Sequence, residues 1–199
     1  MHQKKQKTMA GSQFTVFGKN HRIGSYILII NLAAPSRIAF GKFQQGALFT
    51  IPAGDYLYIG SALGNEVSGS PLARRVLRHT TRSDSQPHHK IREPLCTHLI
   101  ENKITETSKI ARSQKKLRWH IDYLLDLPDA EITHIVLIRT PLSIEQKLAE
   151  LLEQQQETSL IAPRLGAQDS KKNTHILKTT NVNQLLNILD IAIPDMIKS

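Results

Sequence analysis

A basic stripe with helical spacing is the feature of this sequence best suited to chemistry. Its members lie at i, i+3, i+4 and i+7 and are Arg75, Arg78, His79 and Arg82. Pro71 suits the first turn of a helix, and Leu72 and Val76 mark the side of that helix available to a core. Guanidinium groups along one face favour binding of phosphate oxygens. The alternative is a solvated helix face, where such residues usually lie.

The positive charge of the chain is concentrated around this stripe. The 199 residues carry a net charge of +9, and residues 71–120 hold twelve Lys or Arg against four carboxylates. Residues 1–54 hold seven Lys or Arg and no carboxylate, whereas residues 121–199 have a net charge of −4. A positive region attracts polyanions and adds salt-dependent affinity for each phosphate. Charge therefore favours nucleic acid as the partner, with acidic proteins as the alternative.

Composition excludes several other classes of protein. Hydrophobic residues make up 40% and charged residues 22% of the chain, which is enough for a core. The single cysteine, Cys96, leaves no internal disulfide or cysteine-rich zinc module and favours a cytoplasmic location. The longest apolar run extends over residues 26–34 and is far shorter than the ~20 residues that span a bilayer. No glycine-rich phosphate loop is present, so nucleotide-driven chemistry has no support.

The elements that position the stripe follow from hydrophobic periodicity. We predict strands over 25–32, 37–43, 47–51, 56–61 and 132–139, and helices over 71–79, 119–127, 144–156 and 185–193. Gln44, Gln45 and Gly46 separate two of these strands and indicate a hairpin. Residues 1–22 are predicted to be a basic, disordered arm. The polar stretch 80–116 is predicted to be a mobile insertion.

Two tripeptides about thirty residues apart carry a family resemblance. Gly24-Ser25-Tyr26 opens the first long strand and Tyr58-Ile59-Gly60 closes a later one, and YLYIGSALG, LARRVLRH and LRWHIDYLL follow in order. This ordered set resembles the GIY-YIG nuclease superfamily, in particular the branch known as domain of unknown function 123. The resemblance implies an α+β fold with a small central three-stranded antiparallel sheet, plus an N-terminal hairpin, flanked by helices. It assigns this domain to residues 23–178, with a C-terminal helix in 179–199.

The same resemblance implies a phosphodiesterase site. Tyr26 and Tyr58 would face each other across adjacent strands, and one of them would deprotonate or orient the attacking water. Arg75 would neutralise charge on the scissile phosphate. Glu145 would hold one divalent ion, Mg²⁺ or Mn²⁺. The implied activity is a metal-dependent endonuclease, a hydrolase acting on DNA, with RNA left open as an alternative.

Further residues are predicted to contact the nucleic acid: Gly60, Arg78, His79, Arg82 and His120. Two other functions remain open for the same fold. One is a nucleic-acid-binding module without turnover. The other is an adaptor that recruits an acidic protein through residues 80–116.

Each predicted site residue also has a plainer interpretation. Tyr26 and Tyr58 are typical of half-buried sheets. Glu145 suits the start of a helix, where the dipole favours a carboxylate. Gly60 is also explained as a strand end, and His120 as a packed histidine. His120 and Asp122 are two residues apart, so on a helix they point to different faces and do not share a metal.

The C-terminal part departs from the pattern of the branch. That branch commonly has a segment resembling FGxSDCxCxSH, and here LGAQDSKKNTH stands at residues 165–175. This chain keeps Gly166, Asp169 and His175 of that segment, whereas Ser170 and Lys172 stand in place of its cysteines. Gln146 stands where a cysteine often follows the helix glutamate. A thiolate metal site in this segment is therefore excluded.

Overall fold

Three long strands with alternating apolar residues form the centre of the molecule. The computed structural model describes residues 12–67, 69–106, 115–166 and 174–198. Strand β2 (Gly24–Leu32) lies between β5 (Gly54–Ala62) and β6 (Ala130–Arg139) and pairs antiparallel with both. β2 is almost entirely buried, and most of β5 and β6 is buried, because helices cover both faces of the sheet.

Shorter strands extend this sheet at both edges. β1 (Phe14–Phe17) pairs parallel with β6, and β8 (Ile176–Thr179) and then β7 (Thr158–Leu160) continue the sheet beyond β5. The result is a mixed six-stranded sheet in the order β1-β6-β2-β5-β8-β7, rather than the predicted three-stranded antiparallel sheet. The added strands have three or four residues each, too few for a clear periodic signal.

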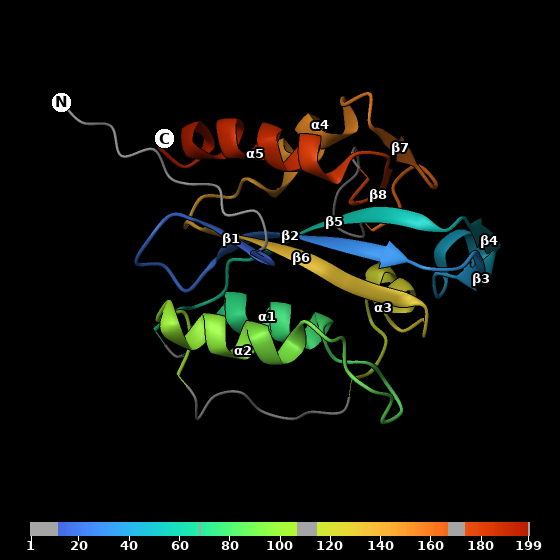
Figure 1. Ribbon diagram of the computed structural model, residues 1–199, viewed down its shortest axis with the longest axis horizontal. Coiled ribbons are helices and arrows are strands. Elements are labelled where there is room, and N and C mark those ends of the chain that lie inside the picture. Colours follow the sequence, from blue (N-terminus) through green and yellow to red (C-terminus); the bar gives the residue numbers. More distant parts are fainter. Residues whose placement is uncertain (1–11, 68, 107–114, 167–173, 199) are drawn as a thin grey trace.

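Five helices form two layers around the sheet, so the fold class is α+β (Figure 1). One layer holds α1 (Pro71–His79), α2 (Arg92–Glu101) and α3 (His120–Leu125), and the other holds α4 (Glu145–Glu153) and α5 (Val182–Met196). Successive side chains of β2 point to opposite faces of the sheet, so β2 packs against both layers. Tyr26, Leu28 and Ile30 pack toward the first, whereas Ile27 and Ile29 pack toward the second. Among the described residues, none of the helices has the length and apolar character that crossing a membrane requires.

The predicted hairpin is present as a separate two-stranded sheet. β3 (Ser36–Ala39) pairs antiparallel with β4 (Leu48–Ile51). Between them the 3-10 segment η1 (Phe43–Gly46) contains Gln44 and Gln45 at φ values of 45° and 60°. This left-handed conformation is uncommon for residues other than glycine.

Within the predicted insertion, residues 80–106 include a helix and buried side chains. This stretch contains α2, which packs beside α1, and the buried guanidinium of Arg92 joins the two helices. Arg92 donates hydrogen bonds to the Leu77 carbonyl (2.7 Å) and to the hydroxyls of Thr80 (3.1 Å) and Thr81 (2.9 Å). Apolar residues are spread around α2 rather than gathered on one face, so its sequence shows no helical stripe. Residues 107–114 of the predicted insertion, and 1–11 of the predicted arm, lie outside the described residues. β1 occupies part of the remaining arm.

Replacing Arg92 with methionine tests this joint. Arg92→Met keeps an unbranched side chain but removes every donor, so we expect the free energy of unfolding to fall by about 2–4 kcal/mol. Urea denaturation measures that loss, and hydrogen exchange should accelerate within α2. The matched variant Arg74→Met changes an exposed residue of α1 and should cost less than about 0.5 kcal/mol. Equal stability of the two variants would contradict the role given to Arg92.

Candidate active site

Tyr26 and Gly60 form the closest packed contact of the site. They are directly opposite each other on β2 and β5. A Cβ atom on Gly60 would lie 2.4 Å from the Tyr26 hydroxyl oxygen and 2.5 Å from Cζ. The phenol ring therefore occupies the space that any other residue at position 60 would need. This accounts for the glycine of Tyr58-Ile59-Gly60 without a contact to nucleic acid.

The structure brings Tyr26 and Tyr58 together on the same face of the sheet. Their ring centroids are 6.1 Å apart, and both rings are buried. Burial raises the pKa of Tyr26 well above its ordinary value, and the charge of Arg75 opposes that rise. Burial, together with the nearby carboxylate of Glu145, also raises the pKa of Tyr58. Neither phenol is ionised at neutral pH in this environment.

His79, at the end of α1, holds the hydroxyl of Tyr26. The Tyr26 oxygen lies 2.8 Å from His79 Nε2, and His79 Nδ1 lies 3.7 Å from Asp122 Oδ1. Burial lowers the pKa of His79 to about 4, with Asp122 opposing the shift. The imidazole is therefore neutral at pH 7. With its proton on Nδ1, facing Asp122, its Nε2 accepts the hydrogen bond that the Tyr26 hydroxyl donates.

Asp122 is a fully buried carboxylate on α3 with several partners. Arg78 donates to both of its oxygens, at 2.8 Å and 3.0 Å, and the backbone N–H groups of Arg118 and Trp119 donate to Oδ2. The Lys115 ammonium lies 3.6 Å away. Burial alone would raise the pKa of Asp122, but the nearby His79, the hydrogen bonds from Arg78 and the charge of Lys115 hold that pKa well below its ordinary value. Asp122 thus stays ionised and fixes α1 against α3.

Two of the three arginines predicted to bind phosphate, Arg75 and Arg78, differ in their surroundings. Both guanidinium groups lie over the Trp119 ring, Arg75 at 4.4 Å and Arg78 at 4.3 Å from its centroid. Arg78 is neutralised by its bidentate pair with Asp122. No carboxylate among the described residues lies within ion-pairing distance of Arg75, which is half-buried. Its donors therefore remain available to a substrate anion, and Trp119 fixes its position.

Glu145, the first residue of α4, reaches the same end of β5. The Ser61 hydroxyl donates to its Oε2, and His175 Nδ1 lies 3.2 Å from its Oε1. Burial would raise the pKa of Glu145, but His175, Ser61 and the charge of Arg75 lower it below the ordinary value. The carboxylate is therefore ionised at neutral pH.

The predicted divalent ion is compatible with this carboxylate. A carboxylate has about four lone-pair sites, and two are used by Ser61 and His175. Mg²⁺ commonly takes one or two carboxylates and completes its shell with water and substrate phosphate. No group of three or more His, Cys, Asp or Glu side chains suited to a metal occurs in the described residues. Glu145 would thus be the protein ligand, while Asp169 lies outside the described residues.

Two residues predicted to contact nucleic acid are buried and use polar atoms within the protein. Arg82 is buried and donates to the carbonyls of Pro87 and Ala130, so its guanidinium does not face a phosphate. The expected stripe fails there because α1 ends at His79, and helical spacing does not extend to position 82. His120 is also nearly buried, and its Nδ1 accepts a hydrogen bond from the Gly166 backbone N–H at 3.1 Å.

Sequence reasoning did not assign three residues of the site: Ser61, Asp122 and His175. Ser61 directly follows the second tripeptide, and His175 ends the C-terminal segment that resembles the family pattern. Both positions lie in or beside segments that resemble the family pattern, but only the folded structure shows that each residue contacts Glu145. For Asp122 the spacing predicts only that it does not share a metal with His120, and its role as the partner of Arg78 and His79 depends on how α3 packs against α1.

Comparison with known proteins gives the family. The family model described as domain of unknown function DUF123 matches residues 25–198. The chain belongs to this family. The matched residues include α2, α5 and all the site residues named above. No curated protein and no solved structure matches the chain.

The contact between Tyr26 and Gly60 predicts the effect of adding one methyl group. Gly60→Ala should displace the Tyr26 ring and lower the free energy of unfolding by about 1–3 kcal/mol, because the core cannot take the extra volume without strain. Gly64→Ala is the matched control, since a Cβ there would lie 3.6 Å from Pro71, an ordinary contact distance. Urea denaturation of both variants checks this, and equal stabilities would contradict the packing described.

The buried His79 predicts a dependence of stability on pH. The unfolded chain takes up a proton at this histidine near its ordinary pKa of about 6.5, whereas the folded chain does so only near 4. Stability should therefore fall as pH is lowered from about 6.5 to 4, by about 3 kcal/mol from this residue. His79→Gln should show a shallower fall over the same range. His89, whose pKa burial also lowers to about 4, is present in both proteins and cancels in the comparison. Identical pH profiles of unfolding would contradict this account.

Proposed function

We propose that this protein is a divalent-metal-dependent endonuclease of the GIY-YIG type that hydrolyses phosphodiester bonds of DNA. One observation carries the proposal. Tyr26, Tyr58, Arg75 and Glu145 come from β2, β5, α1 and α4, yet they lie close enough for the charges of Arg75 and Glu145 to shift the pKa of both phenols. These are the four residues to which the resemblance assigns catalysis. Two phenols, a guanidinium and a carboxylate are suited to phosphoryl transfer, which requires positioning and charge stabilisation.

Tyr26 is the better candidate to receive the proton of the attacking water. A phenol that receives a proton must release its own, and a raised pKa makes that release difficult unless a proton acceptor lies beside the phenol. Tyr26 has such an acceptor in His79, at 2.8 Å. The water proton would pass to the Tyr26 oxygen as the Tyr26 proton passes to His79 Nε2, so no phenolate has to accumulate. Asp122 then faces the imidazolium that forms.

Arg75 and Glu145 would act on the phosphate. Arg75 would donate to its non-bridging oxygens as negative charge develops. A divalent ion bound to Glu145 would supply Lewis-acid stabilisation of the phosphate and of the departing oxygen. Ser61 and His175 would orient the carboxylate for that ligand. The leaving oxygen would take a proton from solvent.

The charge around the site supports a polyanionic substrate. Arg74, Lys116 and Arg118 are exposed beside Arg75 and Trp119. They belong to the segment with the largest excess of positive charge in the chain. Such residues would contact backbone phosphates on either side of the scissile bond without reading sequence.

A second candidate is a nucleic-acid-binding module without turnover. The observation that favours it is that both carboxylate oxygens of Glu145 already have partners, Ser61 and His175. If that arrangement persists with metal present, Arg75 and its exposed neighbours would hold phosphate without cleaving it.

Nicking of supercoiled DNA with Mg²⁺, Mn²⁺ or chelator distinguishes these functions. The parent should nick only with metal, and Glu145→Gln and Tyr26→Phe should each slow nicking by about 10²–10⁴-fold with little change in DNA affinity. Tyr56→Phe is a matched control, because Tyr56 lies on β5, next to the strand of Tyr26, and donates its hydroxyl to the Pro52 carbonyl away from the site. Tight, salt-sensitive binding without nicking in either metal would refute the nuclease and favour the binding module.

A further inference from the structure

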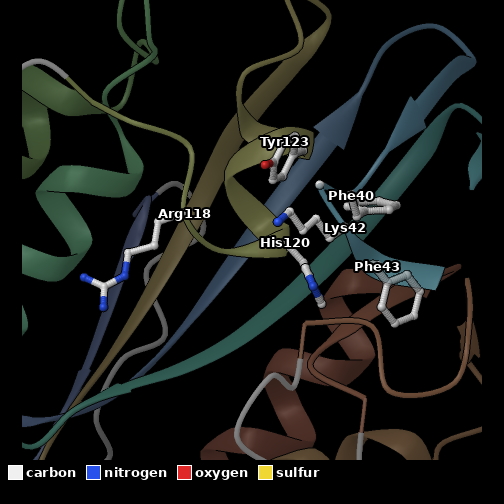
Figure 2. Close-up of a pocket in the computed structure, with 7 residues that line it drawn as sticks. Phe40, Lys42, Phe43, Arg118, His120 and Tyr123 are labelled. Carbon is white, nitrogen blue, oxygen red and sulfur yellow. The ribbon is translucent and has the colours of Figure 1, made fainter. Parts of the chain in front are cut away.

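A cavity of about 390 Å³ lies beside the start of α3, between that helix and the hairpin tip. Figure 2 shows the side chains that surround it, among them Phe43, Tyr123, His120, Lys42 and Arg118. Its volume is at the lower end of the range for small-ligand sites, roughly 300–1,000 Å³. It therefore suits a single small ligand rather than an extended chain.

Aromatic rings form much of the wall. Phe43 and Tyr123 are half-buried, and the Phe43 ring lies 5.0 Å from His120, centroid to centroid. Gly41 allows Tyr123 to lie against the hairpin, since a Cβ on Gly41 would be 2.7 Å from the Tyr123 hydroxyl oxygen. Rings that are partly exposed around a cavity offer faces on which a planar group can stack.

Two cationic side chains are among the polar groups that line the cavity. Lys42 and Arg118 are exposed, and neither makes an ion pair with another described residue. In Figure 2 the Lys42 side chain extends toward the rings, whereas Arg118 lies on the other side of α3 and points away from them. A ligand that fits both features has a planar aromatic part and negative charge at its ends.

The cavity is connected to the active site in two ways. Trp119 lies between Arg118 and His120 in the chain, and the Arg75 guanidinium lies over its ring. His120 also accepts from the Gly166 N–H, and the adjacent Leu165 carbonyl accepts from the N–H of His175, the partner of Glu145. Residues that line the cavity are therefore chain neighbours or hydrogen-bond partners of residues that contact Arg75 and Glu145.

We propose that this cavity binds one unpaired nucleotide adjacent to the scissile phosphate. Its base stacks on Phe43 and Tyr123, and Lys42 binds an adjacent phosphate. A paired base has both faces covered by its neighbours in the duplex, so an unpaired base fits this cavity better. The inference rests on the proposed nuclease function and names its substrate class, DNA with an unpaired nucleotide beside the cleaved bond.

The backbone of the hairpin tip agrees with a binding role. Gln44 and Gln45, directly after Phe43, have left-handed φ values, which are sterically unfavourable for residues other than glycine. Conformations of this kind cost roughly 10-fold or more in stability and cluster at ligand clamps. Lys42 and Phe43, which directly precede them, border the cavity.

The experiment compares two DNA duplexes of one sequence, in chelator. One is fully paired and the other has a single bulged 2-aminopurine. The parent should bind the bulged duplex at least about fivefold more tightly and quench the 2-aminopurine by stacking. Phe43→Leu and Tyr123→Leu should each lose this preference and the quenching, and Lys42→Gln should lower the salt slope by about 1. Thermal denaturation confirms that each variant is folded.

Matched controls lie away from the cavity. Phe14→Leu removes a half-buried aromatic ring of β1, and Lys147→Gln removes an exposed lysine of α4. Both should keep the preference of the parent.

The outcomes separate this inference from the proposed function. Metal-dependent nicking with no preference for the bulge, or a preference kept by Phe43→Leu and Tyr123→Leu, would overturn the cavity proposal and leave the nuclease standing. A preference that depends on Phe43 without any nicking would support the cavity and refute the nuclease.

Discussion

The ionised carboxylate of Asp122 is the interaction on which the site depends. It is buried with no exposed surface, and its charge is balanced by Arg78, by two backbone N–H groups and by the nearby Lys115. A buried ion whose partner is removed costs several kcal/mol, so this cluster can adopt essentially one arrangement. That arrangement sets the position of His79 relative to Tyr26. It also places Trp119 under the Arg75 guanidinium, so the proton acceptor and the phosphate ligand are positioned by one contact between α1 and α3.

The sheet explains how groups from both helical layers meet. Tyr26 and Tyr58 point toward the layer of α1 and α3, whereas α4 packs on the opposite face. Glu145 nevertheless joins the tyrosines because it begins α4 at the end of β5, where Ser61 holds it. β8 contributes its preceding residue, His175, to the same point. The site therefore lies at an end of the sheet, the one place from which both layers can be reached.

The sequence predicted the long elements well and the short ones poorly. Strands β2, β5 and β6 and helices α1, α4 and α5 have clear periodicity, because each buries a regular set of apolar residues. β1, β7 and β8 are too short for that signal, and α2 has polar and apolar residues on all sides. Arg82 was misplaced because a periodic pattern does not reveal where a helix ends. The pairing of Glu145 with Ser61 and His175 joins residues up to 84 positions apart, a distance at which sequence spacing carries no information.

The contact between Tyr26 and Gly60 changes how the two tripeptides should be read. Each looks like an independent signature, one for each strand. In the structure they describe a single packing event, since the ring of the first fills the space left by the absent side chain of the second. Selection would therefore act on the two positions jointly: a larger residue at 60 would be tolerated only alongside a smaller one at 26. Counting the two motifs as separate support for a shared ancestry would count the same constraint twice.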